Sequence, residues 1–287
     1  MTMSLSRAAQ RRLLLWALLL PMAVVNFVTF ILPMLRLGMI SFIEARPGGV
    51  LTDVFTFGNY IDFFRDPFSY KLIWNSLRMS LIVTLGTLVA AYPIALFLYR
   101  VNPVWRNILF VITISPLLVS AVVRTYGWMV LLGNKGLING LLMSAGLIDG
   151  PIRLMNNELG VYIGLIEIMI PYMALALIAG FGRLDPVYEE AAAMLGANAF
   201  TRFYRIIVPL TMPGILLGCL LVFVLSVSSF ITPKLLGGGR VFLLATEVYD
   251  QAIVRLEWTQ AASTSVIVLL IFGLAMMLYT RIARRYE

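Results

Sequence analysis

The sequence predicts an all-α membrane protein with six transmembrane helices and both termini in the cytoplasm. Of its 287 residues, 61% are hydrophobic and only 13% are charged, which is far from the balance of a soluble domain. Several apolar runs are long enough to cross about 30 Å of hydrocarbon, which takes roughly 20 residues per helix. We find no polar–apolar alternation of the kind that a membrane-spanning β-strand needs, so helices are expected throughout.

The expected spans follow one another along the chain, so we expect a single transmembrane domain over residues 1–287. The first apolar run follows Arg7, Arg11 and Arg12 and could pass for a signal peptide. It is too long for the apolar core of one, and no small-residue cleavage site follows it, so we interpret it as a retained helix. The six spans are expected at about residues 13–36, 72–98, 107–132, 158–180, 210–232 and 258–280.

Orientation follows from the distribution of arginine. The N-terminus and the connections 99–106, 181–209 and 281–287 are rich in arginine, whereas the other loops hold most of the acidic residues. Loops rich in Lys and Arg remain on the cytoplasmic side, so six spans place both termini there. The net charge of +8 therefore reflects topology rather than nucleic-acid binding. The arginines concerned are Arg7, Arg11, Arg12, Arg100, Arg106, Arg183, Arg202, Arg205, Arg281, Arg284 and Arg285.

Three extracytoplasmic connections are too long for simple turns. Residues 53–71 are rich in Phe and Tyr, as expected at the lipid headgroups. Residues 136–148 are apolar but too short to span, which favours an interfacial or re-entrant helix. Residues 237–258 begin with three glycines and then become amphipathic. None of these segments is a separate domain, so any large soluble function must come from partners.

The connection before the fifth span has the pattern of a soluble amphipathic helix. Asp185 can cap it, Pro186 suits its first position, and Glu189 and Glu190 place negative charge near the positive end of the helix dipole. A short helix is therefore expected from about residue 186.

Gly196 is expected to break this helix. A second short helix can then start near Asn198 and carry Arg202 and Arg205, before Pro209 ends it and the fifth span begins. On these grounds alone, an ordinary connecting loop lying on the bilayer surface is an equally good interpretation.

The same residues resemble a known motif. The matching pattern is Glu190-Ala191-Ala192, three residues, Gly196, nine residues, Ile206, one residue and Val208-Pro209. It resembles the EAA loop of permease subunits in binding-protein-dependent ABC importers of type I. Val208 stands where Leu is commoner. The similarity is greatest to the first permease of spermidine/putrescine-type transporters. Further matches are "GNY" at 58–60, "NSL" at 75–77, "YP" at 92–93, "RTYGW" at 124–128, "IPY" at 170–172 and "PLTMPGILLG" at 209–218.

This resemblance implies a subunit that forms half of a translocation pathway in the bacterial inner membrane. Its implied partners are a cytoplasmic ATPase dimer that carries ATP and Mg, a second homologous permease and an extracytoplasmic solute-binding protein. Polyamine is the first choice of substrate, while other small amines, amino acids, opines and aminophosphonates stay open. In the coupling segment 183–209, the residues implied to dock on the ATPase are Glu189, Glu190, Ala191, Ala192, Gly196, Arg202 and Pro209.

Missing motifs agree with a non-catalytic subunit. The sequence has no G-x-x-x-x-G-K-[ST] phosphate loop, so ATP hydrolysis is expected on a partner. With no histidine, a Ser-His dyad and an H-E-x-x-H zinc site are excluded, and the single Cys219 has no ligand cluster around it. An ATP-independent secondary transporter or channel would predict inverted repeats with paired broken helices, or a series of intramembrane acids, and the sequence shows neither. A structural scaffold would explain the spans but leave the EAA spacing unexplained.

Glu167 is the clearest candidate for the translocation pathway, because charged groups at membrane depth are rare and costly. Two interpretations are equally good. The carboxylate can face the pathway and attract a cationic group, or it can form an ion pair with Arg124 or Arg78.

Aromatic side chains could complete the pathway. Tyr126, Trp128 and Tyr172 could form a wall for an ammonium group, although an interfacial anchor is the favoured interpretation for Trp128. Phe230 lies in "SSFITPKLLGGG", residues 228–239, where the fifth span breaks. This break is either a gate that lines a cavity or a simple loop.

Overall fold

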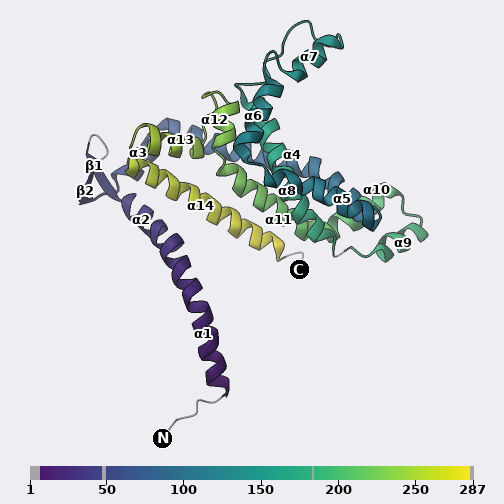
Figure 1. Ribbon diagram of the computed structural model, residues 1–287, viewed down its shortest axis with the longest axis horizontal. Helices are drawn as coiled ribbons and strands as arrows, with labels where there is room; N and C mark the ends of the chain where they lie inside the picture. The colour runs from purple at the N-terminus through teal and green to yellow at the C-terminus, as the bar shows by residue number, and fades with distance from the viewer. Residues whose placement is uncertain (1–6, 47–49, 183, 285–287) are drawn as a thin grey trace. The chain divides into compact units, whose positions relative to one another are not determined.

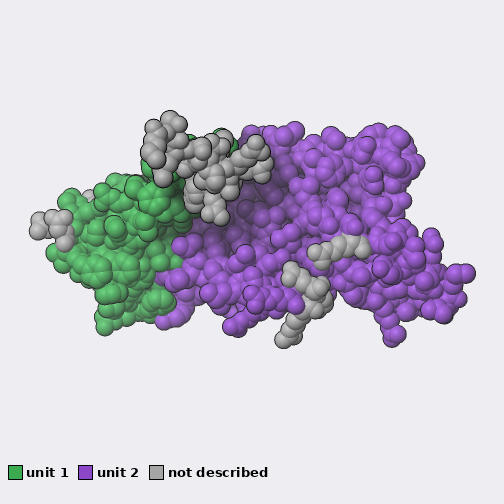
Figure 2. Space-filling model, turned by 90° about the horizontal axis from the view of Figure 1, so that it is seen from below, with its two compact units in different colours: residues 1–65, 251–266 green, residues 66–250, 267–287 purple. Residues whose placement is uncertain are grey.

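The structure of the protein is a computed structural model that describes residues 7–46, 50–182 and 184–284. Arg183 and Arg285, which contributed to the predicted orientation, lie outside the described residues. The chain forms two compact units, coloured separately in Figure 2. Unit 1 comprises residues 1–65 and 251–266, and unit 2 comprises residues 66–250 and 267–287.

Unit 1 contains the first predicted span, drawn in purple in Figure 1. Helix α1 (Arg7–Asn26), the π-helical turn η1 (Phe27–Ile31) and helix α2 (Leu32–Ile40) follow one another without a break. Residues 17–40 are long and apolar enough to cross a membrane, and none of the residues in their most apolar window is buried inside the protein. Such a surface is suited to contact with lipid.

A β-hairpin follows this span, which the sequence analysis did not predict. Strands β1 (Ile43–Arg46) and β2 (Val50–Phe55) pair antiparallel, and helix α3 (Gly58–Arg65) comes next. The ring of Phe42 packs on Phe55, Phe57 and Tyr60, with centroids 5.0–5.4 Å apart. Thr and Val at alternate positions of β2 favour a strand, so the all-α prediction holds for the spans but was wrong for this short segment.

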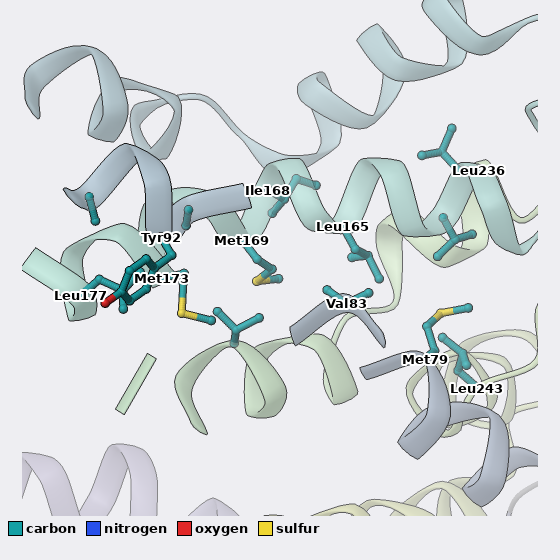
Figure 3. Close-up of a cluster of buried hydrophobic side chains, with 14 of the residues drawn as sticks. Met79, Val83, Tyr92, Leu165, Ile168, Met169, Met173, Leu177, Leu236 and Leu243 are labelled. Atoms are coloured by element: carbon teal, nitrogen blue, oxygen red, sulfur yellow. The ribbon is translucent and has the colours of Figure 1, made fainter. Parts of the chain in front are cut away.

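Unit 2 is built on three helices that pack side by side: α4 (Pro67–Arg100), α8 (Glu158–Phe181) and α11 (Val208–Val227). Their buried apolar side chains form one core, part of which is shown in Figure 3. Helices α8 and α11 approach closely, because a Cβ atom on Gly180 would lie 2.7 Å from the Cα atom of Gly214. Small residues permit such backbone contact between membrane helices.

The third predicted span, residues 107–132, is a bent pair of helices, a feature that its apolar pattern did not indicate. The segment consists of α5 (Pro103–Ile114), the 3₁₀ turn η2 (Ser115–Leu118), α6 (Ala121–Leu132) and the short helix α7 (Leu137–Ser144). The two halves are bent by 96° at the break after Leu118. Pro116 removes a backbone donor there, and Ser120 caps α6 by accepting a hydrogen bond from the N–H of Val122.

The described residues contain five helices able to cross a membrane, or six if the bent pair counts as one span. This agrees with the six predicted spans. Helix α7 confirms the short helix expected within residues 136–148. The remaining elements are α9 (Pro186–Met194), α10 (Ala199–Arg202), the π-helical turn η3 (Phe203–Ile207), α12 (Ile231–Leu236), α13 (Leu244–Tyr249), the π-helical turn η4 (Asp250–Val254) and α14 (Trp258–Ala283).

Candidate coupling segment and translocation cavity

Helix α9 begins as its sequence predicts. The side chain of Asp185 accepts a hydrogen bond of 3.0 Å from the N–H of Val187, and Pro186 occupies the first helical position. Glu189 lies in the first turn, where negative charge is favourable. The local sequence therefore determines where this helix starts.

Gly196 separates α9 from α10, as predicted. Its φ angle is +81°, in the left-handed region that glycine adopts without strain, and a Cβ atom there would meet nothing within 4 Å. The side chain of Asn198 then caps α10 by accepting a hydrogen bond of 2.8 Å from the N–H of Thr201. The requirement for glycine at this position comes from the backbone alone.

Pro209 does not end the second helix, so this prediction was wrong. The helix runs without a break from Ala199 to Val227 through the π-helical turn η3. Within that turn, the N–H of Val208 bonds to the carbonyl of Phe203, one residue further back than in an α-helix. The wider turn makes room for the proline ring, which would otherwise clash with a carbonyl in the preceding turn.

The coupling segment exposes apolar side chains that a solvated loop would avoid. Met194 is 91% exposed, Leu195 is 89% exposed and Phe200 is 70% exposed. Ala191 and Glu190 are also exposed, whereas Ala192 is half-buried. Clusters of exposed apolar side chains mark surfaces that contact a protein or a membrane.

The two glutamates of α9 have different surroundings. Glu189 accepts a hydrogen bond of 2.8 Å from Arg100 at the end of α4, and its side chain is only 17% exposed. Glu190 is exposed to solvent. Both line a hollow of about 570 Å³, together with Arg100 and the half-buried Arg202. The two glutamates, predicted to dock together, therefore differ: Glu189 makes an internal contact and Glu190 is open to solvent.

A second hollow, of about 610 Å³, lies where the start of α6, the middle of α8 and the break between α11 and α12 meet. Of the predicted pathway residues, Arg124, Tyr172 and Phe230 line it. Tyr126 is 54% exposed and lies outside the lining. The broken end of the fifth span, residues 228–232, therefore lines a cavity, as one of its two interpretations expected.

Glu167 forms an ion pair with Arg124, one of its two proposed partners. An Arg124 Nη1 atom lies 3.5 Å from Oε1 of Glu167, and Trp128 Nε1 donates a hydrogen bond of 3.2 Å to Oε2. Arg78 pairs instead with Glu158, at the first turn of α8. Trp128 therefore supports the carboxylate through its indole N–H, a role that the favoured interpretation as an interfacial anchor did not include.

Sequence reasoning missed a second group of contacts beside the cavity. Lys234 on α12 pairs with Asp250 and lies 5.8 Å from the centre of the Tyr249 ring, which stacks on Phe230 at 5.1 Å. These residues are too far apart in the sequence for any periodic pattern to pair them. Across residues 7–46, 50–182 and 184–284, no group of His, Cys, Asp and Glu side chains could hold a metal ion.

Comparison with known proteins gives one consistent result. Residues 82–287 match the family described as binding-protein-dependent transport system inner membrane component. The chain is 35% identical over 251 residues to the spermidine/putrescine transport system permease protein PotB of Haemophilus influenzae, covering 88% of this chain and 87% of that protein. The PotB protein of Escherichia coli K12 is 36% identical over 253 residues, covering 88% and 92% of the two chains.

Solved structures show the same fold. A bacterial ABC transporter that imports the acidic polysaccharide alginate aligns with a TM-score of 0.75 over 96% of both chains, at 18% identity. The MetNI methionine ABC transporter aligns with a TM-score of 0.57 over 76% of this chain and 95% of that chain, at 14% identity. These likenesses concern the fold alone.

Proposed function

Because the chain belongs to the family of binding-protein-dependent transport system inner membrane components, we propose that it forms half of the translocation pathway of an importer of polyamines such as spermidine or putrescine. Members of this family are non-catalytic subunits of bacterial inner-membrane transporters, and ATP is hydrolysed by a separate subunit. The proposed assembly contains this chain, a second homologous permease, a cytoplasmic ATPase dimer and an extracytoplasmic binding protein.

The choice of polyamine rests on the relatives, which are named spermidine/putrescine transport system permeases and align over 88% of this chain. A dication crossing the membrane needs anionic or aromatic surface. Glu167 and Trp128 offer such groups next to the cavity, and Tyr172 and Phe230 offer aromatic rings in its lining. The pathway residues that we propose are Glu167, Arg124, Tyr126, Trp128, Tyr172 and Phe230.

The coupling segment, residues 183–209, is proposed to face the cytoplasm and to dock on the ATPase. The observation that carries this proposal is the helix–glycine–helix geometry with its exposed apolar residues. A helix of this size with a protruding apolar surface fits a groove on a partner protein. The proposed docking residues are Glu189, Glu190, Ala191, Ala192, Gly196, Arg202 and Pro209, with Glu189 acting through Arg100.

One observation favours a second class of solute. The cavity lining contains Arg124 and no carboxylate, and a guanidinium is suited to binding an acidic group. A small amino acid, opine or aminophosphonate would present both an acidic group for Arg124 and an amine for Glu167. The structure therefore gives a physical reason to include such solutes in the first substrate screen.

Purification followed by an ATPase assay tests the proposal. An ATPase and a second permease are expected to copurify with the chain from the membrane. In the reconstituted complex, binding protein loaded with spermidine or putrescine should stimulate ATP hydrolysis, whereas stimulation only by an amino acid or phosphonate would favour the second class. Purification without any ATPase would contradict the proposed assembly.

A further inference from the structure

Helix α4 is attached to the coupling segment by two side chains at its last turn. The hydroxyl of Tyr99 donates a hydrogen bond of 2.5 Å to the carbonyl of Leu184, and Arg100 donates one of 2.8 Å to Glu189. These bonds join residues 85 and 89 positions apart in the sequence. They hold both the approach to α9 and its first turn against α4.

The opposite end of α4 is attached to the segment that follows α12. The hydroxyl of Ser76 accepts a buried hydrogen bond of 2.8 Å from the N–H of Leu244, and Asn75 donates one of 3.3 Å to the carbonyl of Phe242. The ring of Phe242 also packs edge-on against Phe68, with centroids 5.5 Å apart. A few residues earlier in the chain, α12 lines the cavity.

Between these two attachments α4 is a single helix. From Ser76 to Arg100 it spans about 36 Å at a rise of 1.5 Å per residue, which is more than the thickness of the hydrocarbon layer. Its inner face is buried against α8 and α11, and Pro93 is the one proline inside it. A packed helix of this kind moves largely as one body, so a displacement at one end reaches the other.

The direct covalent connection from α8 to α9 is less suited to transmitting a displacement. Helix α8 ends at Phe181, and residues 184 and 185 are not helical. Outside a helix the backbone lacks the repeated bonds that stiffen it along one axis, so such a path transmits a displacement less directly than a helix does. The side contacts from Tyr99 and Arg100 therefore attach the start of α9 to α4 more directly than the covalent connection attaches it to α8.

We propose that α4 transmits movement of the coupling segment to the cavity-lining segment around α12, and that Arg100 is the positioning residue that joins α9 to α4. This inference rests on the proposed docking of the coupling segment on an ATPase. Arg100 needs no contact with the substrate or with nucleotide in this role. It acts by keeping Glu189, and with it α9, at a fixed distance from α4.

Charge reversal tests the link in the complete complex of this chain, the second permease, the ATPase and the binding protein, reconstituted in lipid vesicles. Arg100→Glu and Glu189→Arg are each expected to lower the stimulation of ATP hydrolysis by spermidine-loaded binding protein about fivefold or more. Arg100 is not one of the proposed docking residues, so Arg100→Glu should leave basal hydrolysis and copurification of the ATPase normal. The double reversal should restore stimulation. Arg106→Glu is the matched control, because Arg106 is exposed on the next helix and makes no ion pair within the described part of the chain.

A second readout follows the far end of α4 and needs no transported substrate. Arg240→Cys, made together with Cys219→Ala, places a single exposed thiol next to the segment held by Asn75 and Ser76. Its rate of maleimide labelling should differ between the nucleotide-free and vanadate-trapped complexes. Arg100→Glu should abolish this difference, and the double reversal should restore it.

The outcomes are distinguishable. If polyamine-loaded binding protein fails to stimulate even the unaltered complex, the proposed substrate is wrong, and the thiol readout alone decides on the role of α4. If Arg100→Glu keeps the labelling difference, or if the double reversal performs no better than the single changes, α4 is not the transmitting element. If Arg100→Glu does not assemble, the milder Arg100→Gln is measured in the same two ways, and unchanged labelling again overturns the inference.

Discussion

Replacing Glu167 by Gln deletes one negative charge in the middle of α8 while keeping the size of the side chain. Gln can still accept the hydrogen bond from Trp128, so the loss falls on the contact with Arg124. Breaking a fully buried ion pair costs about 3–5 kcal/mol. Here the side chains of Glu167 and Arg124 are 31% and 12% exposed, and Oε1 of Glu167 lies 3.5 Å from Nη1 of Arg124. We therefore expect the free energy of unfolding to fall by about 2 kcal/mol.

A loss of this size should be visible as a fall in melting temperature of about 4–8 °C. The assay measures the melting temperature and the substrate-stimulated ATPase rate on the same purified complex. Glu158→Gln is the matched control, since it makes the same change in the same helix at a pair whose side chains are 38% and 44% exposed. It should cost less than about 1 kcal/mol.

The two roles of Glu167 give different results. A structural ion pair predicts a lower melting temperature that is restored when Arg124→Glu is combined with Glu167→Arg. A pathway carboxylate predicts normal assembly and stability together with lost transport of a cationic solute. Full stability and full activity together would refute the reasoning on both counts.

Three further changes test the packing of the helices and the coupling segment. Gly180→Ala forces a Cβ atom against the backbone of α11 and should destabilise the protein by about 1–3 kcal/mol. Gly127→Ala, where nothing lies within 4 Å, is the control and should leave the melting temperature unchanged or raised. Equal effects of the two changes would contradict the close approach of α8 and α11. Gly196→Val puts a β-branched side chain at a φ of +81° and should leave membrane insertion intact but uncouple transport from hydrolysis, so normal uptake into vesicles would argue against the docking role. Glu190→Lys reverses an exposed charge on the docking surface and should weaken copurification of the ATPase without changing the melting temperature, and an unchanged yield of ATPase would count against that surface.

The sequence was sufficient to predict those structural features that depend on residues close together in the chain. The start of α9 at Asp185 and Pro186, the break at Gly196 and the cap at Asn198 were all predictable, because each depends on a side chain bonding within its own turn or on the φ angle of one residue. The apolar spans were predictable for a similar reason, since lipid imposes one length and one composition on every crossing helix.

Two kinds of feature were missed: the local effect of a proline and contacts between distant residues. The bend after Leu118 and the continuous helix through Pro209 both contain proline, and the effect of a proline depends on whether a wider turn or a fresh cap is available to accommodate it. The contacts of Arg100 with Glu189 and of Lys234 with Asp250 join segments that meet only in the folded chain. A single sequence contains no periodic signal for such pairs.

Uptake of radiolabelled spermidine into vesicles that contain the complete complex is the most direct test of the central claim, which is that this chain forms part of an ATP-driven polyamine importer. We expect uptake only when ATP, the ATPase and the binding protein are all present, and none when the coupling segment carries Gly196→Val. Uptake that persists without ATP and follows an imposed proton or sodium gradient would contradict it.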